Sequence, residues 1–218
     1  MLKTDYKKEV ESTLKLIREE IDKGILEGNV ELAFNKINKG MKALIGLDIN
    51  TIDTLAFKQV IDLISKDNQY NADRYIALGQ LLYFQGYVYG VLENEINKVN
   101  YYKKSVEGFY EAYLEEEDID SNYLNDISKV LDEISNYEID LSYNKKVFRL
   151  YEVCNNFDKA ENILFDMIKG SNKDKEIIDL GISFYERLKE KPEEELEDGN
   201  LPLEEVEDSL QDLKNIRI

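Results

Sequence analysis

Carboxylates are the only abundant side chains in this sequence that could perform acid–base or metal chemistry. The 218 residues include 46 aspartates and glutamates and no histidine, so the usual proton shuttle and imidazole metal ligand are missing. The single cysteine, Cys154, lies between Val153 and Asn155, with no neighbouring cation to activate a nucleophilic thiolate. We therefore expect no enzyme and no cofactor. A lone cysteine cannot form an internal disulfide, which favours a cytoplasmic location.

The strongest local cluster of carboxylates runs from Glu115 to Asp126. Its spacing imitates the opening of a calcium-binding loop, at Asp118, Asp120 and Asn122. The imitation fails at the sixth position, where Tyr123 replaces the required glycine, and at the twelfth, where Lys129 replaces the bidentate glutamate. The segment is therefore predicted to be the end of one helix followed by the capped start of the next.

A second acidic run, from Glu190 to Asp212, holds eleven carboxylates and one lysine. We interpret it as the solvated face of a terminal capping helix, with a landing site for a basic partner as the alternative. The formal net charge of the chain is -18. That charge repels phosphate backbones and anionic lipids, so we expect neither nucleic acid nor membrane as a partner, and a basic protein or peptide is favoured electrostatically.

Helices must position these groups, because the sequence has only 2 prolines and 11 glycines and its apolar residues recur at steps of three and four. The expected helices cover 4–25, 30–44, 51–65, 73–92, 96–116, 121–137, two in 142–167, one after 174 and one ending near 216. The polar segment 66–71 is the expected boundary between an N-terminal helical region, 1–66, and the remainder, 71–218. The uncharged stretch from Tyr75 to Leu92 is expected to be a buried helix rather than a membrane span.

The stretch from Ser142 to Met167 is the clearest helical hairpin. Its first helix has an apolar stripe that includes Phe148 and Tyr151, and Asn155-Asn156 breaks it. The second helix continues the apolar spacing with Phe157, Ala160, Leu164 and Met167.

Three helical units resemble tetratricopeptide repeats. Leu78, Gly79 and Leu82 match the first helix of that repeat, and Ser105, Phe109 and Ala112 match the second, although the connection between them is about fourteen residues too long. Tyr151, Ala160 and Leu164 match a second unit, and Leu180, Gly181 and Phe184 match a third. The resemblance implies an all-α superhelix of stacked antiparallel helix pairs, with degenerate repeats in 71–218 and a C-terminal capping helix.

A broader resemblance covers nearly the whole chain. The order of ALIGLDINTID, ALGQLLYFQG, YYKKSVEGFYEAY, YEVCNNFDKAENILFDMI and GNLPLEEVEDSLQDL resembles an uncharacterised family of bacterial helical proteins, found mainly in Gram-positive species, with tetratricopeptide-like regions. This resemblance implies a fold and a bacterial origin and adds no chemistry.

The tetratricopeptide register predicts which residues line a concave groove, because the first helix of each pair faces it. They are Asp73, Ile76, Gln80, Tyr83 and Phe84 from the first unit, Lys145, Arg149 and Glu152 from the second, and Ile182, Tyr185 and Glu186 from the third. We expect a non-enzymatic protein that binds a protein or peptide there. The alternatives are a peptide- or small-molecule-responsive regulator and, last, a carboxylate-dependent enzyme; a homodimer is compatible with an uncapped end of the stack.

Overall fold

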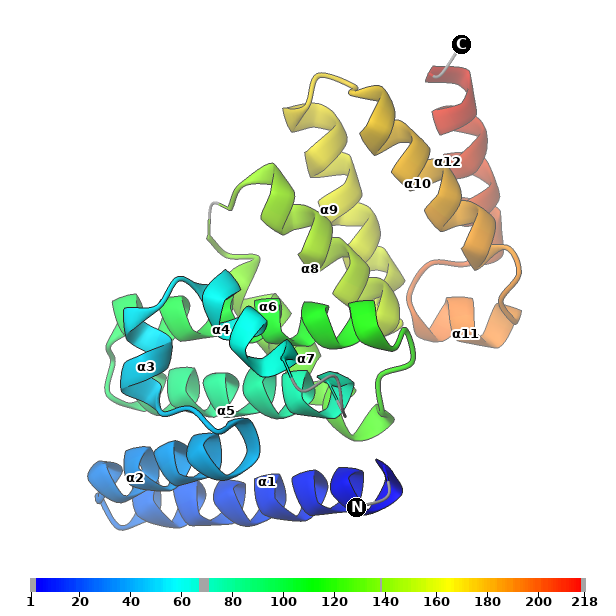
Figure 1. The fold of residues 1–218 in the computed structure, drawn as a ribbon. Helices are drawn as coiled ribbons and strands as arrows, with labels where there is room; N and C mark the ends of the chain where they lie inside the picture. The colour runs from blue at the N-terminus through cyan, green and yellow to red at the C-terminus, as the bar shows by residue number, and fades with distance from the viewer. Residues whose placement is uncertain (1–2, 67–70, 138, 217–218) are drawn as a thin grey trace. The chain divides into compact units, whose positions relative to one another are not determined.

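The computed structural model describes residues 3–66, 71–137 and 139–216, and every regular element within these ranges is helical. This confirms the all-α prediction. The chain divides into two compact units, which we call unit 1 (residues 1–134) and unit 2 (residues 135–218) (Figure 1). Each unit is described by itself below.

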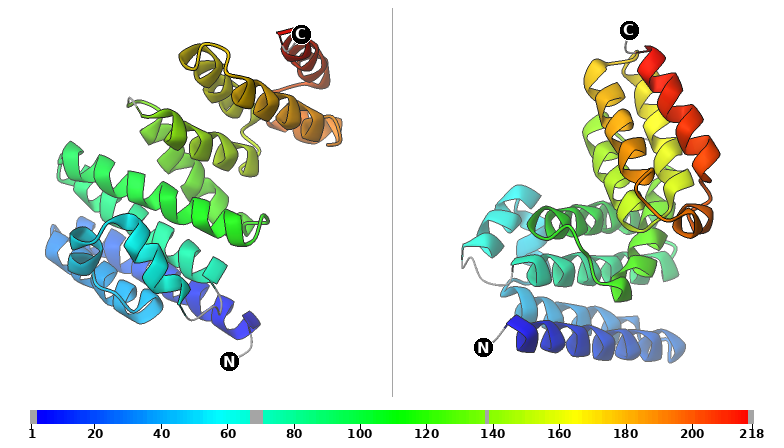
Figure 2. Two further views of the ribbon diagram at one scale, coloured as in Figure 1. Left: turned by 45° about the horizontal axis from the view of Figure 1, so that its top comes forward. Right: turned by 90° about the vertical axis from the view of Figure 1, so that its right-hand side faces the viewer.

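Unit 1 is built in layers. Helices α1 and α2 form an antiparallel pair, and α5 packs on that pair with α6 on its other side (Figure 1 and Figure 2). The element bounds are α1 Lys3–Leu26, α2 Val30–Gly40, the π-helix η1 Met41–Ile45, α3 Ile49–Thr54, α4 Phe57–Ser65, α5 Asn71–Val91, α6 Glu95–Glu115 and α7 Ser121–Ile134.

Helix α5 is the centre of unit 1, as its uncharged sequence predicts. Thirteen of its 21 residues are buried, since it is packed by α1, α2, α6 and α7. Within the described ranges, no helix combines the length and the apolar character needed to cross a membrane.

Small residues let α5 and α6 approach closely. A Cβ atom added to Gly108 would lie 2.9 Å from the Gly79 backbone nitrogen, and the Ser105 hydroxyl donates to the Gly79 carbonyl at 2.7 Å. The two helices are 21 residues each and are joined by the short turn 92–94. The extra residues between the two segments that match a repeat are therefore additional helical turns of α5 and α6 and do not form a long loop.

The helix expected over 51–65 is interrupted, which corrects the prediction of one continuous element. Leu55 is extended (φ -88°, ψ 150°) and separates α3 from α4, and the adjacent Ala56 is exposed. Asp48 caps α3 by accepting the Thr51 amide at 2.9 Å.

Arg74 of α5 holds the helix ends on either side of this bend. Its guanidinium donates to the carbonyl of Ile64 at 2.7 Å and to the carbonyl of Ile45 at 3.1 Å. These carbonyls lie at the ends of α4 and η1. The carbonyls of a last helical turn lack partners within the helix, so one side chain supplies a partner at both ends.

Unit 2 contains two helix pairs, α8 with α9 and α10 with α12 (Figure 1). The bounds are α8 Leu141–Val153, α9 Phe157–Gly170, α10 Lys175–Leu188, α11 Glu193–Asp198 and α12 Leu203–Ile216. The predicted hairpin over 142–167 is confirmed as α8 and α9. Asn155 turns the chain with a positive φ of 55°, a conformation that asparagine tolerates better than most residues.

The predicted boundary at 66–71 lies largely outside the described ranges, which omit residues 67–70. Unit 1 ends at Ile134, where the helix expected to reach Tyr137 also ends. Glu138 also lies outside the described ranges.

Candidate binding groove

Two neighbouring cavities lie in unit 1 between α1, α5 and the segment that leads into α7. The first, here called the smaller cavity, has a volume of about 270 Å³. The second, the larger cavity, has a volume of about 690 Å³. Tyr123 lines both, so we treat them as two parts of one groove.

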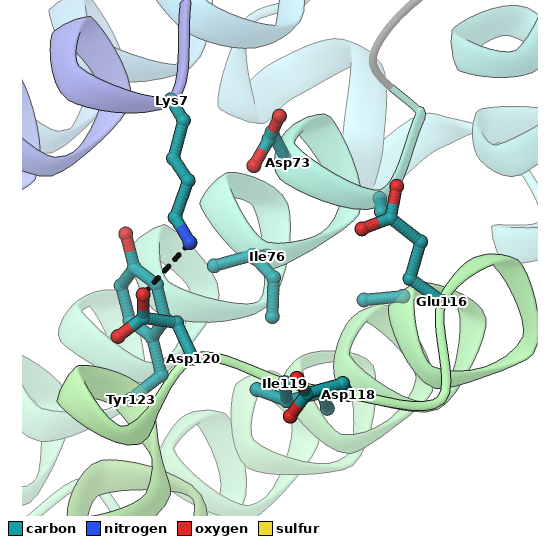
Figure 3. A pocket seen from close by; sticks show the side chains of 10 residues that line it. Lys7, Asp73, Ile76, Glu116, Asp118, Ile119, Asp120 and Tyr123 are labelled. Carbon is teal, nitrogen blue, oxygen red and sulfur yellow. Dashed lines mark ion pairs between the residues drawn. The ribbon is translucent and has the colours of Figure 1, made fainter. Parts of the chain in front are cut away.

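The smaller cavity combines an apolar floor with an acidic rim (Figure 3). Its apolar lining is Ala72, Ile76, Ala112 and Ile119. Its charged lining is Asp73, Glu116, Asp118, Asp120 and Lys7. Four carboxylates therefore face one ammonium group.

Lys7 reaches from α1 across the cavity to Asp120. The Lys7 Nζ lies 2.8 Å from Asp120 Oδ2, as the dashed line in Figure 3 shows, and Asp120 Oδ1 accepts the Asn122 amide at 2.9 Å. The hydrogen bond from Lys7, followed by that from Asn122, holds the pKa of Asp120 below its usual range. The same contact raises the pKa of Lys7, so both groups are charged near neutral pH.

Tyr123 lies where the two cavities meet. Its side chain is 9% exposed, and its hydroxyl makes no hydrogen bond with the part of the chain that the structure describes. Burial, followed by the charges of Glu11, Asp120 and Asp73, raises the pKa of this hydroxyl. It is therefore a neutral polar group on the wall of the groove.

Gln80 gives the larger cavity a polar wall. It is 3% exposed, and its Nε2 donates to Asp126 Oδ2 at 2.5 Å. Its Oε1 is buried without a hydrogen-bond partner among the described residues. A buried amide oxygen without a partner is costly, and here it leaves an unsatisfied acceptor within the wall of the larger cavity.

Arg18 of α1 closes the larger cavity on its other side. Its guanidinium carbon lies 5.3 Å from the Phe84 ring centroid and 5.2 Å from that of Tyr87, and its Nη1 is 3.8 Å from Asp126 Oδ2. These contacts hold the side chain along the wall of the groove, because a guanidinium interacts favourably with aromatic faces.

The groove contains four of the five residues predicted from the first repeat unit. Asp73 and Ile76 line the smaller cavity, and Gln80 and Phe84 line the larger one. Tyr83 does not line either cavity; it is 4% exposed and packs beneath Arg18, whose guanidinium carbon is 5.9 Å from the ring centroid.

The residues predicted from the second tetratricopeptide-like segment are Lys145, Arg149 and Glu152. They lie on α8 and form ion pairs with one another or with side chains of α10. Lys145 pairs with Glu176 at 2.9 Å. Glu152 accepts from Arg149 at 2.9 Å and from Arg187 at 2.7 Å. These side chains therefore connect α8 to α10.

The third predicted set is mostly interior, which corrects its placement on a concave face. Ile182 and Tyr185 are buried, and the Tyr185 hydroxyl donates to Glu161 Oε1 at 2.7 Å. Glu186 is exposed and pairs with Lys214 at 3.0 Å. Both buried residues pack inside unit 2 because α12 and α9 cover the two sides of α10.

The acidic run from Glu190 to Asp212 lies on α11, α12 and their connection. All eleven of its carboxylate residues are exposed, and Val206, Leu210 and Leu213 form the buried stripe of α12. The pattern matches a solvated outer face on a terminal helix.

Sequence reasoning missed the contribution of α1. Lys7, Arg18 and Ser12 line the cavities, but their helix shows only an amphipathic pattern in sequence. For Tyr123 the sequence did contain a hint: this large aromatic residue stands within the acidic segment, at the position where a calcium loop needs glycine. The acidic segment itself supplies the rim of the smaller cavity.

Comparison with known families gives one match. A family model described as a family of unknown function (DUF6483) matches residues 2–217. No curated protein and no solved structure shows a significant match.

Proposed function

Because the chain belongs to this family of unknown function (DUF6483), we propose a role from its own geometry: it is a non-enzymatic protein that binds a peptide segment of a protein partner in the groove of unit 1. The observation that carries the proposal is the groove itself, in which cavities of about 270 and 690 Å³ adjoin at Tyr123. Small-molecule and side-chain sites usually have this scale and this mixture of apolar walls with a few polar groups.

The polar groups of the groove suit a peptide. The buried Gln80 Oε1 needs a donor, and every peptide residue except proline carries an N–H group. The neighbouring Phe84 offers an apolar wall. A peptide in the larger cavity would lie against a wall that Gln80 and Phe84 help to form.

The charge states of the lining residues favour binding over proton transfer. Asp120 has a lowered pKa and Tyr123 a raised one, so neither changes protonation near neutral pH. A general acid or base works best when its pKa is near the working pH. The absence of histidine from the whole sequence supports the same conclusion.

A basic partner is favoured over an anionic one. The chain carries a net charge of -18, and the smaller cavity adds four carboxylates around one lysine. This distribution repels nucleic acid and anionic membranes. We place the interaction in the cytoplasm, because the single cysteine suits a reducing compartment.

We also interpret unit 2 as a pair of tetratricopeptide-like repeats. Helices α8 and α9 have 13 and 14 residues and are joined by the three-residue turn 154–156, as expected for that repeat. The bacterial, mainly Gram-positive, origin indicated by the sequence resemblance remains a prediction.

Selection of peptides from a random library displayed on phage tests the proposal. The full chain is the bait, and individual selected peptides are then measured by fluorescence anisotropy. Replacing the exposed Ser12, which lines the larger cavity, with tyrosine should weaken binding about tenfold or more by filling the groove. Ser183→Tyr is the matched control, since Ser183 is also exposed but lies on α10 in unit 2.

Equal affinities for wild type and Ser12→Tyr would contradict the proposal. So would a selection that yields no peptide with saturable binding. Circular dichroism of each variant confirms that the fold is retained.

A further inference from the structure

We propose that the larger cavity binds an aromatic side chain of the peptide, and that this ring packs on the guanidinium group of Arg18 beside Phe84. The inference rests on the proposed function, because it assigns one subsite of the same groove. It adds the chemical class of the residue that the partner must present, which is phenylalanine, tyrosine or tryptophan.

The charges around the larger cavity favour an uncharged side chain. The lining cations and carboxylates are Lys8, Lys15, Arg18, Glu11, Glu19 and Asp126. Positive and negative groups are therefore equal in number here, although the whole chain carries a net charge of -18. A buried charge needs an opposite charge nearby to offset its loss of water. Because the two signs are balanced in the lining, a neutral side chain enters this cavity at the lowest cost.

Arg18 presents a flat cation on the wall of this cavity. Its guanidinium carbon lies 5.3 Å from the ring centroid of Phe84 and 5.2 Å from that of Tyr87, and its Nε is 3.4 Å from Asp22 Oδ1. These contacts hold the group in place, yet 30% of the side chain is exposed. A guanidinium stacks on aromatic faces, so its exposed part can take a further ring from a ligand.

The same guanidinium distinguishes an aromatic side chain from an aliphatic one. Phe84 and Leu14 line the cavity and are 2% and 3% exposed, so they offer an apolar wall to either kind. An aliphatic side chain gains only from this wall, whereas a ring also gains from the cation. The cavity volume of about 690 Å³ lies within the range of about 300–1,000 Å³ that is usual for ligand pockets, which leaves room for a ring.

Arg149 of unit 2 makes a similar aromatic contact but is paired more closely. Its guanidinium carbon lies 5.6 Å from the Phe148 ring centroid, and its Nη1 is 2.9 Å from Glu152 Oε2. The ion pairs of Arg18 are longer, at 3.4 and 3.8 Å. Strong charge-assisted hydrogen bonds measure about 2.7–2.9 Å, so Arg18 keeps more of its capacity for a ligand.

An NMR titration of the full chain tests the subsite directly. The probe is Nα-acetyl-phenylalanine-N-methylamide, and the matched probe is its cyclohexylalanine analogue, which is similar in shape, more apolar and without a π face. The phenylalanine probe should bind about threefold tighter or more, as one cation–π contact predicts, whereas apolar burial alone would favour cyclohexylalanine. The phenylalanine probe should also shift the Arg18 Hε signal upfield, because a stacked ring shields a proton above its face.

A pair of variants separates the guanidinium from the rest of the cavity. Arg18→Met keeps an unbranched stem and removes the cation, so the preference for the phenylalanine probe should disappear. Arg149→Met is the matched control, since it removes a guanidinium that lies over a ring outside both cavities. It should leave the preference unchanged. The ratio of the two affinities is the readout, because a general change in stability affects both probes alike.

The inference is overturned if neither probe binds, if cyclohexylalanine binds as well as phenylalanine, or if the Arg18 Hε signal does not move upfield. An equal loss of preference in both variants would also overturn it. Failure of the proposed function gives a different result. Phage-selected peptides that lack aromatic residues but bind wild type and not Ser12→Tyr would preserve the groove and exclude the aromatic subsite. Probe binding at Arg18 without any selected peptide would support the subsite and contradict the proposed function.

Discussion

The α5 face of unit 1 and the α8–α10 face of unit 2 come from the same predicted repeat register but have different surroundings. On α5, Asp73 and Ile76 line the smaller cavity and Gln80 lines the larger one. On α8, Arg149 and Glu152 are involved in ion pairs that reach α10. The register identifies a face in both units, but the element packed against that face decides whether it has space for a ligand.

The difference arises from what covers each face. In unit 1, α1 packs on α5 and leaves the groove between Arg18 and Gln80. In unit 2, the side chains of successive helices interlock directly: Phe148 and Phe184 meet edge to face at 5.1 Å. Helix α1, which packs on α5, therefore creates the candidate site.

Truncation of Tyr83 should have the largest effect on stability. Tyr83→Ala should destabilise the protein by about 4 kcal/mol, because it removes a buried ring that stacks on Tyr102 at 5.7 Å. Arg149→Ala in unit 2 should cost only about 1 kcal/mol, since Glu152 keeps two hydrogen bonds from Arg187. Urea unfolding followed by circular dichroism measures both.

If Tyr83→Ala and Arg149→Ala lowered the free energy of unfolding by similar amounts, Tyr83 would not be a core position and Arg149 a surface one. A small cost for Tyr83→Ala would show that the face of α5 beneath Arg18 is open rather than packed. Amide hydrogen exchange, read for each unit separately, locates the destabilised region.

The close contact between α5 and α6 gives the next largest effect. Gly108→Val should cost about 3 kcal/mol, because even a Cβ at this position would lie 2.9 Å from the Gly79 nitrogen and 3.0 Å from its Cα. Gly90→Ala is the matched control on α5. Its added Cβ meets only the flexible Lys98 side chain at 3.4 Å, so it should stabilise the helix by about 0.5–1 kcal/mol. Chemical unfolding tests both, and tolerance of valine at 108 would contradict the packing.

Loss of a helix cap should have the smallest effect and should depend on pH. Asp140 caps α8: its Oδ1 accepts from the Ser142 hydroxyl at 2.5 Å and from the Tyr143 amide at 3.0 Å. The Ser142 contact, followed by that of Tyr143, lowers the pKa of Asp140 in the folded state. The ionised cap therefore contributes stability above the unfolded pKa of about 3.9, and this is lost as the pH falls through the lower folded value.

Asp140→Ala should accordingly cost about 1 kcal/mol at pH 7, with a smaller difference from wild type below about pH 4. Unfolding curves between pH 3 and 7 measure the trend. Asp120→Ala in unit 1 provides the comparison: it should lose stability and also alter peptide binding in the groove, because Asp120 both accepts the Asn122 amide and holds Lys7. Asp140→Ala should leave peptide binding unchanged.

Most of the helices could be predicted because their apolar residues recur with the helical period. The hairpin over 142–167 and the long helices near 73–92 and 96–116 match α8, α9, α5 and α6. The break at Leu55 could not be predicted, because neither proline nor glycine marks it. On either side of this break, the ends of η1 and α4 bind Arg74, a residue of a later helix.

Only one wall of the candidate site, the one formed by α5, could be predicted from the sequence. The resemblance to tetratricopeptide repeats predicted that Asp73, Ile76 and Gln80 line a groove, and their spacing of three and four residues places them on one face of α5. It could not show that α1 supplies Lys7 and Arg18 to the opposite wall, because an amphipathic stripe identifies the buried side of a helix and not its neighbour.

By itself, the sequence determined the all-α class, the acidic character and the lack of histidine chemistry, since these follow from composition and local periodicity. The tertiary structure decided which acidic residues surround a cavity. Asp73 and Asp120 are 47 positions apart, yet they line the same cavity with Lys7. Contacts between distant segments depend on the packing of whole helices, and that packing alone converts the acidic segment after α6 into the rim of a pocket.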